Sequence, residues 1–280
     1  MQNQILEKSF VVSGPARLEL SNIRGSVDIR PGADGVITVK AEKLADTGNT
    51  EQTEIEITQD TGGSVKVKTR FPENWLDLLF CSKPCKVNYI VTAPRACALQ
   101  INGVSNTVFA EGFEGEASFK TVSGEITVRV MNGSLSFDTV SGDIQLSDLT
   151  GKLHLNTVSG AIKGAHLSGA LNLNTVSGDI EFEQSSLPTV TANTVSGGME
   201  LETGLGEGPY KFNSVSGDLT IKLPADAHCT VELQSLSGDL SIKLPVTSVS
   251  RHNGRQITEI QGGGVNVYLN SVSGDMELKS

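Results

Sequence analysis

Apolar and polar residues alternate along most of the chain. Between residues 152 and 156, Leu153 and Leu155 alternate with Lys, His and Asn, and between residues 179 and 183, Ile180 and Phe182 alternate with acidic residues. A period of two is typical of β-strands that bury one face. Patterns with the helical period of 3.6 and helix-capping sequences are almost absent, so the sequence predicts an all-β protein.

A short block that reads Thr/Ser-Val-Ser-Gly-Asp-Ile, or a close variant, recurs between these strands. Its glycines are Gly124, Gly142, Gly160, Gly178, Gly197, Gly217, Gly238 and Gly274, in steps of 18, 18, 18, 19, 20, 21 and 36 residues. A degenerate copy of the block, around Asn106, precedes the block of Gly124. The step of 36 residues fits two periods if residues 248–264 form a repeat that lacks the block. Each repeat is predicted to be a strand, a Ser-Gly corner in which glycine takes a positive φ, a second strand and a connection.

Two architectures fit such a repeat. We favour a β-solenoid, in which each repeat of about 18–21 residues is one coil and equivalent strands stack in parallel about 4.8 Å apart. Identical blocks then stack on themselves as ladders of Asn, Thr, Ser and Val. The alternative is an antiparallel β-meander, in which each Ser-Gly is a hairpin turn.

The chain is expected to divide into an irregular β N-terminal cap, residues 1–103, and a repeat region, residues 104–280, within one continuous domain. The N-terminal part is strand-rich without a regular block, as the protecting end of a solenoid would be. The sequence stops at Ser280, within a few residues of a complete repeat. This predicts an open C-terminal strand edge, through which the chain could form a homo-oligomer.

Composition and charge limit the classes of partner that the chain could bind. The chain has 38% hydrophobic and 19% charged residues, which excludes a disordered chain. Its net charge is −10, and residues 101–280, with 20 acidic and 10 basic residues, carry all of it. This balance argues against nucleic acid and anionic lipid as partners. No apolar run is long enough for a membrane span, and residues 1–10 do not read as a secretory signal. A cytoplasmic location is therefore expected, with the cell surface or envelope as the alternative.

Three columns of the repeat are candidates for chemistry. The acidic column could hold cations such as Ca²⁺, but Ala161 and Gly198 interrupt it, so exposed corner residues are the alternative; its aspartates are Asp143, Asp179, Asp218, Asp239 and Asp275. The serine column has no recurring general base beside it, so we expect no catalysis. The sequence contains no Gly-rich phosphate loop, His-Glu-x-x-His motif or nucleophile elbow, so we expect no cofactor. The asparagine column predicts a hydrogen-bonded amide ladder, with glycan recognition as the alternative; its members are Asn156, Asn174, Asn193, Asn213 and Asn270.

The segment from Phe71 to Cys85 is the least β-like part of the chain. It holds the only tryptophan, and its apolar cluster is a candidate partner-binding anchor or a plug for the first coil; the cluster comprises Trp75, Leu76, Leu79 and Phe80. Cys81 and Cys85 are a possible disulfide or redox pair, with plain thiols as the alternative. Cys97 and Cys229 share the parity of neighbouring apolar residues and are predicted to lie in the core.

The blocks of Thr/Ser-Val-Ser-Gly-Asp-Ile/Leu, together with the strand–proline–strand segment of residues 89–105, resemble a bacterial β-strand-repeat family of putative adhesins, also called Toastrack proteins. The resemblance covers residues 17–279 approximately and implies an all-β, non-catalytic module. The function it implies is a binding scaffold that presents flat β faces to a protein or cell-envelope partner. A head-to-tail self-assembling structural protein and a glycan-binding adhesin are the alternatives.

Overall fold

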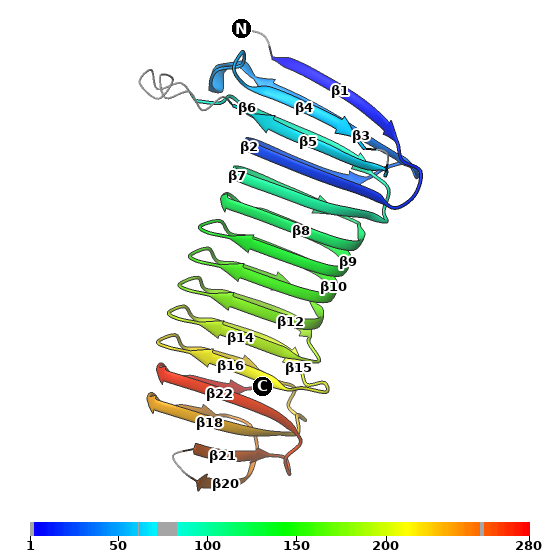
Figure 1. Cartoon of the computed structure of the whole chain (residues 1–280). Coiled ribbons are helices and arrows are strands. Elements are labelled where there is room, and N and C mark those ends of the chain that lie inside the picture. Colours follow the sequence, from blue (N-terminus) through cyan, green and yellow to red (C-terminus); the bar gives the residue numbers. More distant parts are fainter. Residues whose placement is uncertain (1–2, 61, 72–82, 253–254) are drawn as a thin grey trace. The chain divides into compact units, whose positions relative to one another are not determined.

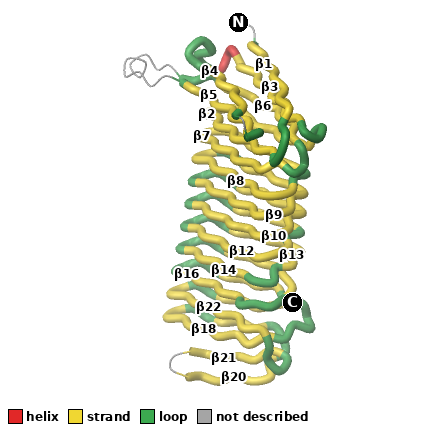
Figure 2. Tube along the Cα trace, turned by 45° about the vertical axis from the view of Figure 1, so that its right-hand side comes forward, coloured by secondary structure: helices red, strands yellow, loops and turns green. Residues whose placement is uncertain are grey.

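The computed structural model describes residues 3–60, 62–71, 83–252 and 255–280. They form two compact units, Met1–Gly142 and Asp143–Ser280, and each is described by itself. Both units consist of strands and loops (Figures 1 and 2), and the described residues contain one short 3₁₀ turn, Ala45–Thr47, and no α-helix. The prediction of an all-β protein is confirmed.

The described residues of the first unit form nine strands. They are β1 (Gln4–Val11), β2 (Ala16–Pro31), β3 (Val36–Leu44), β4 (Glu54–Gln59), β5 (Ser64–Arg70), β6 (Lys86–Ala93), β7 (Cys97–Glu111), β8 (Glu114–Ser123) and β9 (Ile126–Thr139). Strand β8 pairs in parallel with both β7 and β9, and each partner is 18 residues away in the sequence. The predicted boundary between residues 103 and 104 lies within β7.

Strand β2 shows that order in the sequence and order in the sheet differ. It pairs in parallel with β7 along its length, while β5 and β6 pair in parallel with its first and second halves. Beyond them the pairing becomes antiparallel, β4 on β5, β3 on β6 and β1 on β3. The outermost repeat of this unit is thus covered by antiparallel strands, which protect its edges.

Fourteen strands lie in the part of the second unit that the structure describes. They are β10 (Ile144–Thr157), β11 (Ile162–Ala165), β12 (Ser168–Thr175), β13 (Ile180–Ser186), β14 (Val190–Thr194), β15 (Met199–Gly204), β16 (Tyr210–Ser214), β17 (Leu219–Lys222), β18 (Cys229–Ser237), β19 (Leu240–Ile242), β20 (Val246–His252), β21 (Arg255–Ile260), β22 (Val265–Ser273) and β23 (Met276–Lys279). Equivalent strands of successive repeats pair in parallel, so that Asn156, Asn174, Asn193 and Asn213 face one another in register. The antiparallel meander is therefore wrong for the repeats.

The end of the chain lies inside the sheet. Strands β22 and β23 insert between the repeat of β16 and β17 and the repeat of β18 and β19, so that Met276 pairs with Leu219 on one side and Leu240 on the other. The prediction of an open C-terminal edge is wrong, because β23 has a neighbour on both sides. The described residues of the range 248–264 do not form a repeat that lacks the block either. They contribute to an antiparallel hairpin of β20 and β21, in which β21 covers β18 (Figure 1).

Inward-facing residues of each repeat stack on their equivalents. Leu153, Leu155, Leu171 and Leu173 are at most 4% exposed in the second unit. In the first unit the rings of Phe119 and Phe137 stack with centroids 5.4 Å apart and planes 8° from parallel. Burial of this continuous apolar column is the main source of stability in each unit.

The repeated glycine is required by close packing rather than by backbone conformation at most corners. Of the glycines in the column, only Gly124, Gly238 and Gly274 have φ in the left-handed region. A Cβ on Gly178 would lie 2.0 Å from the carbonyl oxygen of Gly160, well inside any allowed contact. The expectation that glycine supplies a positive φ at every corner is wrong, and the spacing between stacked backbones is the common cause.

We predict that Gly178→Ala destabilises the protein by about 2 kcal/mol or more, because a methyl group there overpacks rigid backbone. Gly198→Ala is the matched control, since its nearest neighbour would be Oδ1 of Asp179 at an ordinary 3.5 Å. Alanine already stands at the equivalent position, Ala161. Urea unfolding of both variants measures the difference, and equal destabilisation would contradict the packing explanation.

Candidate functional site

In four of the blocks the threonine, or the serine in its place, binds the glycine N–H of its own corner, whereas the hydroxyls of Thr194 and Ser271 are buried without a hydrogen-bond partner among the described residues. The amide N–H of Gly142, Gly160 and Gly178 donates to the Oγ1 atom of the threonine three residues earlier, at distances of 2.9, 3.0 and 3.1 Å. Ser214 does the same for Gly217 at 2.9 Å. These hydroxyls are buried and fix the shape of the corner.

In most blocks the serine before the glycine binds the neighbouring repeat. The hydroxyl of Ser177 donates to the carbonyl oxygen of Val158 at 3.2 Å, and Ser216 and Val195 form the same contact at 3.3 Å. In the first unit Ser123 and Ser141 bind Val104 and Val122 in this way. The serine column therefore links adjacent corners, and this role accounts for its recurrence.

The aspartates of the second unit also link repeats. Oδ1 of Asp143 accepts a hydrogen bond from the backbone N–H of Ala161 at 2.9 Å, and Oδ1 of Asp179 accepts one from Gly198 at 3.0 Å. Asp218 accepts from Asp275, and Asp275 accepts from Asp239, at 2.9 and 3.0 Å. Ala161 and Gly198 take part as backbone donors, which explains why a side chain is dispensable there. Within the described ranges no three His, Cys, Asp or Glu side chains gather as metal ligands.

The asparagine column is a continuous amide ladder in the second unit. The Nδ2 atoms of Asn174, Asn193, Asn213 and Asn270 each donate to Oδ1 of the preceding Asn in the stack, at 2.9, 2.8, 2.7 and 2.8 Å. Asn270 continues the ladder from Asn213 although 57 residues separate them, because β22 lies beside β16. The predicted ladder is confirmed.

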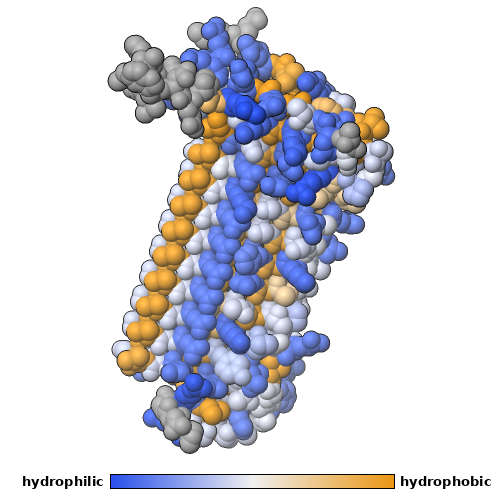
Figure 3. Space-filling view, in the orientation of Figure 1, coloured by the Kyte–Doolittle hydropathy of each residue, from blue (hydrophilic) through white to orange (hydrophobic). Residues whose placement is uncertain are grey.

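The valine of each block is exposed, a feature that the sequence analysis did not single out. Each unit carries a row of these valines, all 45–48% exposed: Val104, Val122 and Val140 in the first unit, and Val158, Val176, Val195, Val215 and Val272 in the second. Leu236, 87% exposed, stands at the equivalent position of β18 and follows Val272 in the stack. Apolar side chains form continuous lines at the edge of the stacked strands in Figure 3. The parity change at each corner, which turns Val outward while Thr stays inward, was the available clue.

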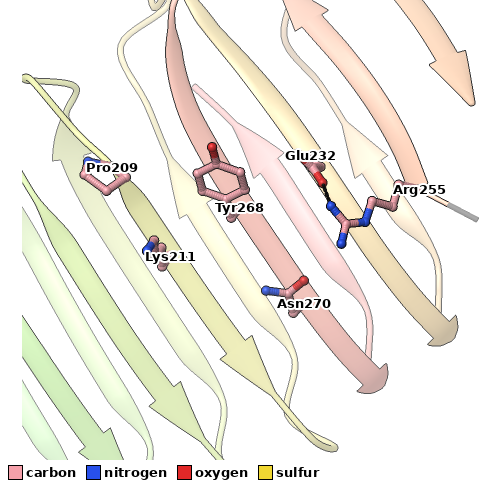
Figure 4. Close-up of a pocket in the computed structure, with 6 residues that line it drawn as sticks. All are labelled: Pro209, Lys211, Glu232, Arg255, Tyr268 and Asn270. Atoms are coloured by element: carbon pink, nitrogen blue, oxygen red, sulfur yellow. Dashed lines mark hydrogen bonds and ion pairs between the residues drawn. The ribbon is translucent and has the colours of Figure 1, made fainter. Parts of the chain in front are cut away.

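The face of the second unit that carries the amide ladder also has a concave surface, which encloses a volume of about 450 Å³. Its lining residues are Pro209, Lys211, Glu232, Arg255, Tyr268 and Asn270 (Figure 4). Arg255 pairs with the carboxylate of Glu232 across this surface. The residues come from four strands, β16, β18, β21 and β22, apart from Pro209, which directly precedes β16.

Three of the four cysteines are described by the structure, and all three are buried. Cys97 and Cys229 are buried as predicted, and burial raises the pKa of the Cys97 thiol to about 12 and that of Cys229 to about 11. Cys85 is buried and free. Cys81 lies outside the described residues, as do the apolar candidates Trp75, Leu76, Leu79 and Phe80, so the proposed pair and the proposed anchor stay predictions.

We predict that Asn193→Ala destabilises the protein by about 1–2 kcal/mol, because it removes two hydrogen bonds of the amide ladder. Asn266→Ala removes an exposed asparagine of β22 outside the ladder and should change the free energy of unfolding by less than about 0.5 kcal/mol. Chemical denaturation compares the two. If both variants lose the same stability, the ladder does not contribute as described.

We further predict that iodoacetamide at pH 8 alkylates Cys97 and Cys229 about tenfold more slowly, or slower still, in the native protein than in the unfolded chain. The thiolate is the reactive form, and a raised pKa lowers its population at that pH. Peptide mapping by mass spectrometry gives the rate at each cysteine. Equal native and unfolded rates would contradict the burial of these thiols.

Known proteins are similar to this chain over nearly its whole length. The family model Toastrack DUF4097 matches residues 16–279. Crystal structures of putative adhesins from Parabacteroides distasonis ATCC 8503 and Bacteroides fragilis NCTC 9343 align over 99% and 98% of this chain and 97% of each of theirs. Their sequence identities are 12% and 10%, with TM-scores of 0.46 and 0.40. A putative cell adhesion protein from Clostridium sporogenes ATCC 15579 aligns over 99% of both chains, with 11% identity and a TM-score of 0.26.

No curated protein matches the chain significantly. Within the described part of the chain, no helix is long and apolar enough to cross a membrane. The match of the family model covers nearly the whole sequence, from the first long strand to the last, and includes every Ser-Gly corner. The chain belongs to the Toastrack DUF4097 family.

Proposed function

We propose that the protein is a non-enzymatic β-solenoid binding module of the putative-adhesin type, and that its valine rows are the surface that contacts a protein or cell-envelope partner. The parallel, in-register stacking within each unit supports the solenoid description. The exposed valine rows carry the functional proposal.

The valine rows are unusual because most other large apolar residues of the repeats are buried. Valine in a strand is ordinarily placed inward, yet every block of the second unit that matches the repeat presents its Val or Leu to solvent. Single exposed apolar residues are common, whereas a contiguous apolar line with polar rows on both sides marks an interaction surface. In the second unit, the buried Thr or Ser precedes each valine of the row, and an exposed Ser follows it.

The structural roles of the other columns favour binding over catalysis. The repeated threonine, serine, aspartate and asparagine side chains bond to the backbone or to one another. A nucleophilic serine needs a general base within hydrogen-bond reach. The hydroxyl of Ser177 instead donates to the carbonyl oxygen of Val158.

The related structures are putative adhesins, which supports a partner at the cell surface. Its net charge of −10 disfavours direct contact with anionic lipid headgroups. We therefore propose a protein or wall component of the envelope as the partner, contacted by apolar burial along the rows.

The quadruple variant Val158→Thr, Val176→Thr, Val195→Thr and Val215→Thr tests this proposal. Threonine keeps the β-branched shape and the extended backbone preference, so folding should be preserved. We expect the variant to lose at least about tenfold in affinity for bacterial cell-envelope fragments, measured by co-sedimentation, because four apolar contacts disappear.

The matched control replaces three exposed valines outside the rows, Val11→Thr, Val246→Thr and Val249→Thr. Its binding should equal that of the wild type. If the two variants bind equally well while both retain the wild-type melting temperature, the rows are not the contact surface.

A further inference from the structure

The concave surface of the second unit brings together residues that are far apart in the sequence. Parallel pairing places Tyr268 of β22 directly beside Lys211 of β16 on one side and Glu232 of β18 on the other. Arg255 reaches Glu232 from β21, and Asn270 lies two residues beyond Tyr268 on the same outward face. The insertion of β22 between β16 and β18 therefore creates this surface.

Tyr268 differs from the other two tyrosines of the chain. Tyr89 and Tyr210 are buried, and the hydroxyl of Tyr210 binds the carbonyl oxygen of Leu187 at 2.6 Å. Tyr268 is half-buried, and its hydroxyl forms no hydrogen bond with the described residues. In Figure 4 its ring is drawn face-on over β22, between Lys211 and the Glu232–Arg255 pair. Because the residue is half-buried, part of its side chain is exposed to solvent.

The equivalent positions of earlier repeats carry no aromatic ring. In-register pairing aligns His154, Asn172, Thr191, Lys211 and Tyr268 in one outward row. No structural ladder runs along this row, in contrast to the asparagine row beside it. The tyrosine is therefore not explained by the repeat.

Polar groups with unused hydrogen-bonding capacity surround the ring. The ammonium of Lys211 has no carboxylate within salt-bridge distance among the described residues. Asn270 donates one amide hydrogen to Asn213 at 2.8 Å, and its own Oδ1 accepts no bond from the described part of the chain. Two cations and one carboxylate give the surface a charge of +1, within a unit where 15 acidic and 8 basic residues give −7.

We propose that this surface is a binding site for an anionic saccharide of the uronic-acid type. The face of an aromatic ring is electronegative and attracts the polarised C–H groups on the apolar face of a pyranose. The carboxylate of the sugar would pair with Lys211, and its hydroxyls would bond to Asn270 and to the Glu232–Arg255 pair. A volume of about 450 Å³ suits a ligand of one to a few sugar rings.

The charge of the unit distinguishes this ligand from a nucleic acid. Bases also stack on aromatic rings, but a phosphate backbone would meet a surface with a surplus of seven acidic residues. A single carboxylate needs only the local positive charge. The site lies on the outward strand face and shares no residue with the valine rows, so it stands independently of the function proposed above.

Calorimetric titration with trigalacturonate, and with the same trisaccharide as its full methyl ester, tests the site on the whole chain. We expect saturable binding of the acid with a Kd of about 1 mM or tighter, and binding of the ester at least about fivefold weaker. Absence of saturable binding of the acid up to about 10 mM overturns the proposal. Equal affinity for acid and ester overturns its anionic part.

Three variants locate the binding. Tyr268→Ala should weaken binding about tenfold or more, whereas Tyr268→Phe should stay within about threefold of the wild type, because the ring and not the hydroxyl provides the platform. Lys211→Met should remove the preference for acid over ester. Thr191→Ala is the control and should bind as the wild type does, because Thr191 lies beside Lys211 in the same outward row but does not line the concave surface. Undiminished binding by a folded Tyr268→Ala variant places the ligand elsewhere and overturns the proposal.

Discussion

The close approach of stacked corner backbones is the constraint on which each unit depends. At Gly178 an added Cβ would lie 2.0 Å from the backbone of the repeat before it, and at Gly142 it would lie closer still. Once the corners are held at this separation, all other positions of the repeat fall into register. The apolar residues then form one continuous buried column, and identical polar side chains come within hydrogen-bond distance of one another.

Because the repeats stack in register, each polar residue type forms its own kind of hydrogen bond. Threonine fixes its own corner, serine and aspartate bond to neighbouring repeats, and asparagine links successive strands. These groups satisfy polar atoms that stacking would otherwise leave unpaired. The apolar side chains of the block form no such bond, and of these the valine faces solvent whereas Ile144, Ile162 and Ile180 are buried. This distribution favours a binding surface that extends along the repeats over a single reactive centre.

Much of this architecture could be read from the sequence, because it follows from local periodicity. Alternation identified the strands and the burial of Cys97 and Cys229, and the recurrence of Asn at one position predicted the amide ladder. The order of stacking could not be read in this way. Since the blocks are nearly identical, the repeat of Gly274 fits beside that of Gly217 as well as beside that of Gly238, and the structure places it between them. The error about the C-terminal edge has this cause.

The proposed saccharide site could not be predicted either, because it also depends on the stacking order of the repeats. Lys211, Glu232 and Tyr268 are separated by 21 and 36 residues, and nothing local to any of them indicates that they meet. Only the insertion of β22 aligns them. The cause of the glycine column was hidden for a related reason: a left-handed turn and a close backbone contact both demand glycine, and a single sequence does not separate them.

Nuclear Overhauser effects between valine and leucine methyl groups test the in-register stacking and its order most directly. In a selectively methyl-labelled sample, the account predicts a chain of contacts from Val158 through Val176 and Val195 to Val215, then to Val272, and from Val272 to Leu236. A direct contact between Val215 and Leu236 without Val272 between them, or no contact between successive valines, would contradict it.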